Sequence, residues 1–291
     1  MSQVGILTDS TAQFPTPFFT GHDLVTVLPM QIQLNGQIYT DGEDISTGDL
    51  PLTASDGLNP RVLPPSVESF RLVLDQLERR YQSIIILLLS SKLSPATKYA
   101  RQAVASLHTS ARIQIIDSGT TAAGLGFLVQ AAAKAAEKGL SSFEITYMLR
   151  VLIRHTYTIF CLQSLTYLSH WGQLDPAQAL VGEMIDLTPI ILLEHGQLRP
   201  TQKARSSRNI VDIFHEFATE IGNLQHIALF RGLNTFFGEA NYLRERIRVD
   251  FPHTPYSEHT LGTTLGTILG PRTLGLVAVE DLSEQPKGIT S

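Results

Sequence analysis

Six consecutive apolar residues, Ile84 to Leu89, stand between Ser83 and Ser90, and this run limits the possible folds more than any other feature. It is far shorter than the ~20 residues that a membrane span needs, and its length and flanking serines indicate a strand rather than a helix. Because both faces of this strand are apolar, both must be covered, which is typical of a parallel sheet between helices. We therefore predict an α/β fold.

The first half of the chain alternates strand and helix patterns, which predicts a mostly parallel sheet with helices on both faces. The predicted strands are Val4–Leu7, Leu24–Leu34, Ser83–Leu89 and Arg112–Ile116. The predicted helices begin at Ser66, at Ser94-Pro95, at Leu125 and at the Ser141/Glu144 capping box.

The pattern changes after His155, so we expect two domains, residues 1–155 (α/β) and 156–291 (α+β). The second domain is predicted to have a helix from Pro176 to about Ile185 and a β-hairpin that turns at residues 194–196. A helix over 209–221, a strand over 226–231, a helix over 237–249 and a strand over 274–279 complete it.

The composition narrows the classes of function. A net charge of -5 without a basic run gives no attraction for nucleic acid. The only cysteine, Cys161, lies in an apolar run and excludes an intrachain disulfide, which favours a reducing compartment. We see neither a secretory signal nor a membrane span, and we expect a cytoplasmic protein.

Hydroxyl and carboxyl groups gather where three of the predicted strands end. They are Asp9 and Ser10, then Ser90, Ser91 and Ser94, then Asp117 and Ser118. In open parallel sheets, ligands bind at this edge. Ser94 begins a helix directly after a buried strand, where hydroxyl and N–H groups suit an anionic oxygen. The alternative is that Ser94 only caps its own helix.

Known catalytic and metal-binding motifs are absent from the sequence. There is no P-loop, no G-x-G-x-x-G after a strand, no G-x-S-x-G elbow and no histidine or cysteine ligand spacing. We therefore predict no catalytic residue, no metal and no cofactor. An acyl- or phosphoryl-transfer site built from Asp9 and Asp117 stays open as an alternative.

Several segments in order resemble the DegV family, the bacterial fatty-acid-binding proteins. They are TDSTAQFP, VLPMQIQLNGQIYTDGEDI, SSKLSPATKYA, IIDSGTTAAGLG and the stretch from TYLSHWGQLDP to TQKAR. The resemblance implies two domains and one buried fatty acid, whose carboxylate is held by hydroxyls of the first domain. Some members present the bound acid to a separate fatty acid kinase, so the resemblance also implies a possible kinase partner.

The resemblance places Ser94 at the carboxylate, and three departures affect the same polar end of the site. The family's threonine is Val62 here, its histidine is Ile268, and an arginine associated with kinase docking or phosphate handling is Gln173. Arg272 is a candidate replacement cation. The ligand contacts that we predict are Ser94, Val62, Leu63, Ser10, Ser118, Ile268 and Arg272.

These observations predict a non-catalytic carrier that binds a long-chain fatty acid or another lipid. Because the head-group contacts are reduced, we expect it to be a poor carrier for phosphorylation. Besides the transfer enzyme, a partner-binding module that has lost its ligand stays open as an alternative.

Overall fold

The computed structural model describes residues 4–54, 60–107, 109–184, 188–233 and 235–283. Within these ranges, no helix combines the length and the apolar character that crossing a bilayer requires.

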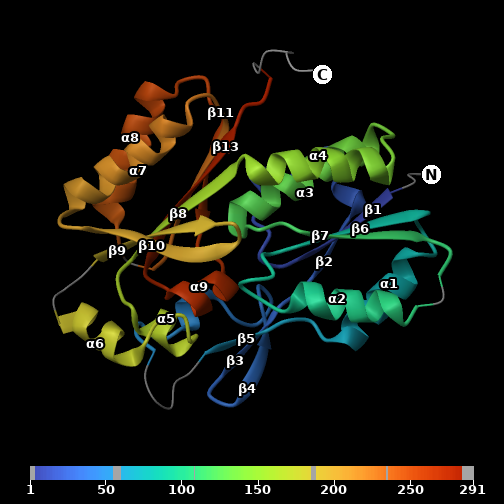
Figure 1. Ribbon diagram of the computed structural model, residues 1–291, viewed down its shortest axis with the longest axis horizontal. Helices are drawn as coiled ribbons and strands as arrows, with labels where there is room; N and C mark the ends of the chain where they lie inside the picture. The colour runs from blue at the N-terminus through green and yellow to red at the C-terminus, as the bar shows by residue number, and fades with distance from the viewer. Residues whose placement is uncertain (1–3, 55–59, 108, 185–187, 234, 284–291) are drawn as a thin grey trace.

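The first half of the chain forms a four-stranded parallel sheet with four helices packed against it. These elements are β1 (Val4–Asp9), β2 (Val25–Leu28), β6 (Ser83–Leu88), β7 (Arg112–Asp117), α1 (Val67–Leu77), α2 (Ala96–Ala105), α3 (Ala122–Glu137) and α4 (Ser142–Arg154). The strand order is β2-β1-β6-β7, with all pairs parallel. Helices α1 and α2 cover one face and α3 and α4 the other (Figure 1). This confirms the predicted α/β architecture.

The prediction of a single strand over Leu24–Leu34 was wrong. The chain forms β2 and then, after Pro29 and Met30, enters a separate antiparallel sheet in the order β4-β3-β5. Pro29 lacks the N–H that a continuing ladder would need. The new elements are β3 (Gln31–Leu34), β4 (Gln37–Thr40), β5 (Arg61–Leu63) and the short 3-10 turns η1 (His22–Leu24) and η2 (Thr47–Asp49).

Two helices begin at other residues than predicted. Helix α3 begins at Ala122 rather than Leu125, and α2 begins at Ala96, with Pro95 rather than Ser94 at its N-cap. The Ser94 hydroxyl instead accepts a hydrogen bond from the Ala96 N–H, at 3.3 Å. The capping box at the start of α4 is confirmed.

A six-stranded sheet dominates the second half of the chain, in the order β10-β9-β8-β13-β11-β12. Its elements are β8 (Thr156–Leu162), β9 (Thr188–Glu194), β10 (Gln197–Ala204), β11 (Leu224–Arg231), β12 (Tyr256–Thr260) and β13 (Thr273–Glu280). Only the β11–β12 pair is parallel among the described strand pairs of this sheet. The predicted β9–β10 hairpin is confirmed.

In the described part of the second half, five helices accompany this sheet. They are α5 (Thr166–His170), α6 (Pro176–Met184), α7 (Ser207–Ile221), α8 (Phe237–Asp250) and α9 (Thr263–Leu269). Helices α7 and α8 cover one face of the sheet (Figure 1). The predicted end of α6 at Ile185 lies outside the described residues.

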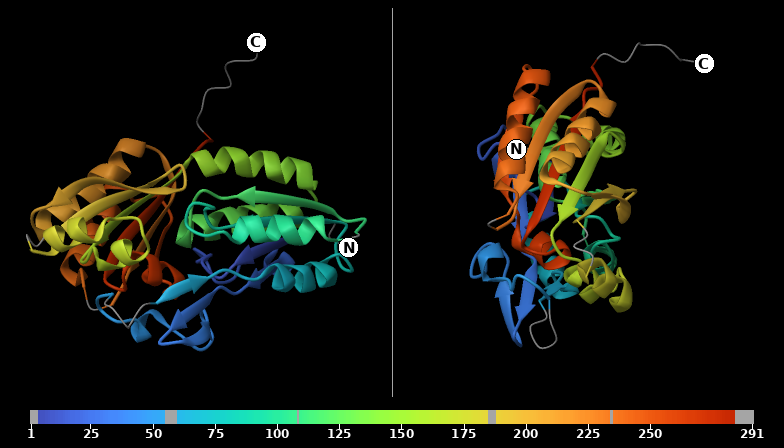
Figure 2. Two further views of the ribbon diagram at one scale, coloured as in Figure 1. Left: turned by 60° about the horizontal axis from the view of Figure 1, so that its bottom comes forward. Right: turned by 90° about the vertical axis from the view of Figure 1, so that its left-hand side faces the viewer.

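One of the hydrophobic core clusters is shared by the two halves, and another lies wholly within the second half. Figure 2 shows the parallel sheet and the six-stranded sheet side by side. The largest buried cluster contains residues of both, from Ile6 in β1 to Ile268 in α9. Every residue of α9 is buried, and α9 contacts β3, β5 and η2 of the first half. The domain boundary after His155 stays a prediction.

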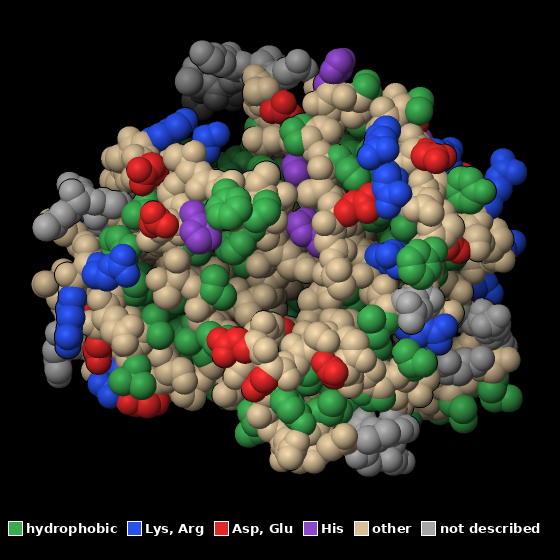
Figure 3. All heavy atoms as spheres, turned by 180° about the vertical axis from the view of Figure 1, so that it is seen from behind, with side chains coloured by type: hydrophobic (Ala, Val, Ile, Leu, Met, Phe, Trp, Pro, Cys, Tyr) green, Lys and Arg blue, Asp and Glu red, His purple; other side chains and the backbone are tan. Residues whose placement is uncertain are grey.

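Polar and aromatic contacts also cross the seam between the halves. The rear face carries histidine side chains beside hydrophobic ones near its middle (Figure 3). The His226 ring of β11 stacks on Phe127 of α3 with 6.2 Å between centroids. Within the second half, the Nε2 of His226 lies 2.9 Å from the Ser257 hydroxyl of the neighbouring strand β12. Gln13 donates from Nε2 to the Thr260 carbonyl.

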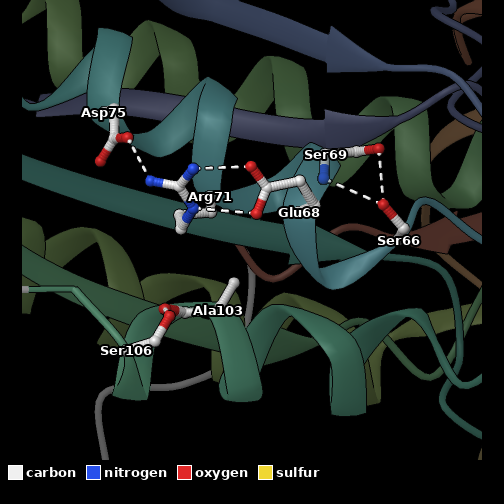
Figure 4. A network of polar contacts seen from close by, with 7 residues as sticks. All are labelled: Ser66, Glu68, Ser69, Arg71, Asp75, Ala103 and Ser106. Carbon is white, nitrogen blue, oxygen red and sulfur yellow. Dashed lines mark hydrogen bonds and ion pairs between the residues drawn. The ribbon is translucent and has the colours of Figure 1, made fainter.

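Local side-chain bonds explain where α1 begins and what holds its first turns (Figure 4). The N-cap Ser66 accepts a hydrogen bond from the Ser69 N–H at 3.0 Å, as predicted from its position before the helix. Arg71 pairs with Glu68 at 2.6 Å and with Asp75 at 3.2 Å, one turn to either side. Such exposed pairs contribute little to stability, because solvent screens them.

Candidate functional site

The polar segments that follow β1, β6 and β7 meet at one edge of the parallel sheet, as predicted. The three strands are adjacent and parallel, so their carboxyl ends share that edge. The partners of each side chain there decide which groups could contact a ligand.

Asp9 joins the ends of β1 and β6. Its Oδ1 accepts hydrogen bonds from the N–H (3.0 Å) and the hydroxyl of Thr11, and its Oδ2 accepts one from the Leu89 N–H (2.7 Å). Burial raises the pKa of the Asp9 carboxyl, while these hydrogen bonds oppose the rise. Since Asp9 has no exposed surface, it lacks the water-accessible position that a transfer reaction requires.

Asp117 plays the same role one strand further along. It accepts hydrogen bonds from the Ser91 N–H (3.0 Å), the Ser91 hydroxyl and the Gly119 N–H (3.1 Å). Both carboxylates therefore hold the loops at the strand ends together. This arrangement does not favour the alternative of a transfer enzyme built on Asp9 and Asp117.

Two of the predicted ligand hydroxyls already have partners within the protein. Ser10 donates to Asp41 (2.8 Å) and accepts from the Met30 N–H (3.0 Å). Ser118 donates to the Thr120 carbonyl (3.1 Å) and accepts from the Thr120 N–H (3.2 Å). Contact of either residue with a ligand stays a prediction.

The start of α2 keeps unused hydrogen-bonding groups. Ser94 is 5% exposed, and its O–H has no acceptor among the described residues. Thr97, one helical turn further on and 4% exposed, has a hydroxyl with no partner at all in that part of the chain. The N–H groups of Thr97 and Lys98 likewise have no acceptor among the described residues. This first turn therefore presents several free donors at the positive end of a helix.

Thr97 was missed from the sequence. A threonine in a helix ordinarily packs or faces solvent, so its residue type carries no signal. The signal available was its spacing of three from Ser94, which puts both on one face of the first turn.

The other predicted ligand residues lie in β5 and around α9. Val62 and Leu63 belong to β5, which contacts α9, and Ile268 in α9 is buried. Arg272 is half-buried in the turn between α9 and β13 and forms no ion pair among the described residues. Their contact with a ligand stays a prediction.

Asp41 was also missed, and it connects the two halves next to this edge. Its Oδ2 accepts hydrogen bonds from the hydroxyls of Ser10 (2.8 Å) and Thr264 in α9 (2.7 Å). Its N–H donates to the Met30 carbonyl at 2.9 Å. Ser10 and Thr264 are 31 and 223 residues away from Asp41 in the sequence, so no local pattern could have identified the connection.

The structure also has surface hollows away from the start of α2. One of about 740 Å³ lies between α7 and α8, and one of about 640 Å³ lies between the end of α4 and the β9–β10 hairpin. Neither is lined by Ser94, Val62 or Ile268. Among the described residues, no three histidine, cysteine or acidic side chains are grouped as a metal site requires. Cys161 is buried, as predicted.

Known proteins resemble the chain over nearly its whole length. A family model described as "Uncharacterised protein, DegV family" matches residues 3–281. A DegV domain-containing protein of Streptomyces coelicolor is 28% identical over 283 residues, which cover 94% of this chain and 97% of that protein.

Two solved structures share the fold. One, described as fatty acid binding of a DegV family protein from Thermus thermophilus, is 25% identical with a TM-score of 0.81, covering 96% of this chain and 100% of that one. The other is the Streptococcus pneumoniae Fatty Acid Kinase (Fak) B3 protein loaded with linoleic acid, 20% identical with a TM-score of 0.82 and the same coverage. The chain belongs to the DegV family.

Proposed function

We propose that this protein binds one long-chain fatty acid, or a related lipid, with the carboxylate at the N-terminus of α2, and that it carries this ligand without chemistry of its own. The proposal rests on two buried hydroxyls at the start of α2. Among the described residues, the Thr97 hydroxyl has no hydrogen-bond partner, and the Ser94 hydroxyl accepts a hydrogen bond but donates none. Fatty acid binding by the related Thermus thermophilus protein supports the same ligand class.

The chemistry of the first turn of α2 suits a carboxylate. A carboxylate accepts hydrogen bonds only, and the hydroxyls of Ser94 and Thr97 and two backbone N–H groups are donors without acceptors. Hydrogen bonds to a charged group contribute about 1.5–3 kcal/mol each, and the helix dipole adds a smaller attraction.

Apolar contacts would supply most of the affinity. Leu93, Ile268 and the half-buried Val62 all belong to or pack against the core cluster shared by the two halves. Each buried CH₂ of an acyl chain contributes on the order of 0.8 kcal/mol. A tail directed into this cluster would therefore bind tightly even with few polar contacts at its head group.

The residues that replace the family's threonine and histidine, Val62 and Ile268, reduce the polar contacts at the head group. We propose that a kinase partner would phosphorylate the bound acid slowly for this reason, and that Arg272 supplies a replacement cation. A normal phosphorylation rate would contradict the first statement. An unchanged fatty acid affinity after Arg272→Ala would contradict the second.

We also propose a domain boundary between His155 and Thr156 and a cytoplasmic location. The boundary is supported by sheet membership, since β1 to β7 form the first two sheets and β8 to β13 form the third. The location is supported by the buried free thiol of Cys161, which is typical of reducing compartments.

The test compares Thr97→Val with Thr121→Val. Both threonines are buried, and both have hydroxyls without a partner, so neither change should destabilise the ligand-free protein. Thr97→Val loses a hydrogen bond to the carboxylate, so its affinity for oleate should be about 10- to 100-fold lower than that of the unchanged protein. Thr121→Val should bind oleate with unchanged affinity. Isothermal titration calorimetry measures both. Equal affinities for the two variants would refute the carboxylate position.

Native mass spectrometry of the purified protein identifies what it carries. A stoichiometric fatty acid supports the proposal, and a different lipid changes the ligand class. A protein that is empty and takes up no added oleate would favour the module that has lost its ligand.

A further inference from the structure

The hollow of about 640 Å³ beside the β9–β10 hairpin, which we call the groove, lies between the two halves of the protein. On one side are the end of α4 and the start of β8, and on the other are the hairpin and Phe217 of α7. Gly119, in the loop after β7, forms part of its wall. Cavities of 300–1,000 Å³ at domain interfaces are typical of small-ligand sites.

The lining combines apolar side chains with one arginine that has no acidic partner in the described part of the chain. Ile153, Leu192 and Phe217 are half-buried and form the apolar part. The Arg154 side chain is exposed, and its guanidinium forms no ion pair or hydrogen bond among the described residues. The one carboxylate of the lining, Glu194, is already paired with Arg199 at 3.4 Å.

The remaining polar groups have defined roles. Tyr157 donates its hydroxyl hydrogen to Glu280 at 3.1 Å, so it offers only an oxygen to a ligand. His195 is exposed at the hairpin turn, and no hydrogen bond is formed by its ring within the described chain. The free donors facing a ligand are therefore Arg154 on one side and His195 on the other.

We propose that this groove is a second binding site, separate from the start of α2, for a small organic acid with an apolar or aromatic body. The apolar body lies against Ile153, Leu192 and Phe217, and the acid group pairs with Arg154. An unpaired guanidinium beside apolar surface favours such a ligand, because arginine binds carboxylate-like groups by two parallel hydrogen bonds.

The position of the groove gives this site a structural consequence. The tip of the hairpin contacts the edge of the parallel sheet, where the Ser90 hydroxyl donates to the Gly196 carbonyl at 2.7 Å. The same turn lies against Gly119, since a side chain at Gly196 would meet the Gly119 Cα at 3.4 Å. A ligand in the groove therefore touches both halves next to the strand-end loops.

The probe for this site is 1-anilinonaphthalene-8-sulfonate, an aromatic anion whose fluorescence rises when it binds apolar surface. Titrations are made on the full chain with and without saturating oleate. We expect one probe molecule per chain that oleate does not displace. Complete displacement by oleate would overturn the proposal, because the probe would then report the fatty acid site alone.

Charge-reversal variants then locate the bound probe. Arg154→Glu should weaken the oleate-resistant binding at least about tenfold, from the loss of one charge-assisted contact. Arg150→Glu, one turn earlier on α4, is the matched control, since Arg150 is exposed and unpaired among the described residues but does not line the groove. Equal effects of the two variants, or none, would overturn the assignment.

A neutral probe separates the charge from the apolar surface. N-phenyl-1-naphthylamine has the same ring system without the sulfonate, and we expect it to bind at least about tenfold more weakly at the oleate-resistant site. Equal affinity for both probes would contradict the role of Arg154. Thr97→Val must leave the oleate-resistant site unchanged, so failure of fatty acid binding and failure of this site give different results.

Discussion

Removing the carboxylate of Asp41 should destabilise the protein, because this side chain connects the two halves beside the strand ends. Its Oδ2 accepts two hydroxyl hydrogens, from Ser10 at 2.8 Å and from Thr264 at 2.7 Å, and Asp41 is only 7% exposed. Each bond to a charged group contributes about 1.5–3 kcal/mol. The variant also removes the desolvation cost of the buried carboxylate, which offsets part of the energy of the two lost bonds. Asp41→Ala should therefore lower the free energy of unfolding by about 2–4 kcal/mol.

Asp41→Asn is the matched control. Its amide oxygen can take the place of Oδ2 and accept from both hydroxyls, so we expect a loss below about 1 kcal/mol. Thr264→Val removes one of the two donors and should cost about 1–2 kcal/mol. The double variant Asp41→Ala/Thr264→Val loses the bond between these two residues only once. Its loss in free energy of unfolding should therefore be about 1 kcal/mol smaller than the sum of the losses in the two single variants.

Urea unfolding measures these differences, followed by far-UV circular dichroism and by the fluorescence of Trp171, the single tryptophan. Coincident transitions by the two probes show that one free energy describes the unfolding. The reasoning is refuted if Asp41→Ala costs less than about 0.5 kcal/mol, or if the two changes add to within about 0.3 kcal/mol.

Two further predictions concern pH and packing. Burial lowers the pKa of His226 from 6.5 to about 4, with His259 adding to the effect. As pH falls from about 6.5 to 4, the unfolded chain takes up this proton first. The free energy of unfolding should therefore fall by up to about 3 kcal/mol, and a His226→Asn variant that keeps the full pH dependence would contradict this. Gly126→Ala should destabilise by about 1–3 kcal/mol, because its Cβ would lie 2.0 Å from the Gln13 carbonyl oxygen. Gly238→Ala, with no neighbour within 4 Å, should be neutral or stabilise α8 by up to about 1 kcal/mol; equal thermal unfolding shifts for the two variants would contradict this packing argument.

The parts of the fold that were predictable are those in which local pattern and burial agree. The apolar run at Ile84–Leu89 and the capping box at Ser141 each indicate one structure, and the protein adopts it. Strand β12 was missed because it is a partly exposed edge strand of mixed residues, YSEHT. Helix α9 was missed because TTLGTIL has low helix propensity, which its complete burial against the first half overrides.

The candidate site was partly predictable for a similar reason. The position of Ser94 just before α2 could be predicted, because a serine and a proline after a buried strand mark the start of a helix, whereas its contact with a ligand stays a prediction. The role of Asp41 could not be predicted, because it depends on Thr264 in α9. The bonds of the Ser10 hydroxyl to Asp41 and to the Met30 N–H could not be predicted from its residue type and position, and its contact with a ligand stays a prediction. Hydrogen-bond partners distant in sequence decide such assignments.

The burial of α9 against β3 and β5 sets the order in which the chain can fold. During synthesis the first half leaves the ribosome more than 100 residues before α9. The apolar residues that α9 covers in the folded protein, such as Leu50, are therefore exposed until α9 has been made. Contacts of such long sequence separation slow folding and leave apolar surface exposed meanwhile. We therefore expect the isolated first half, residues 1–155, to be less soluble than the whole chain, because α9 is not there to cover these apolar residues.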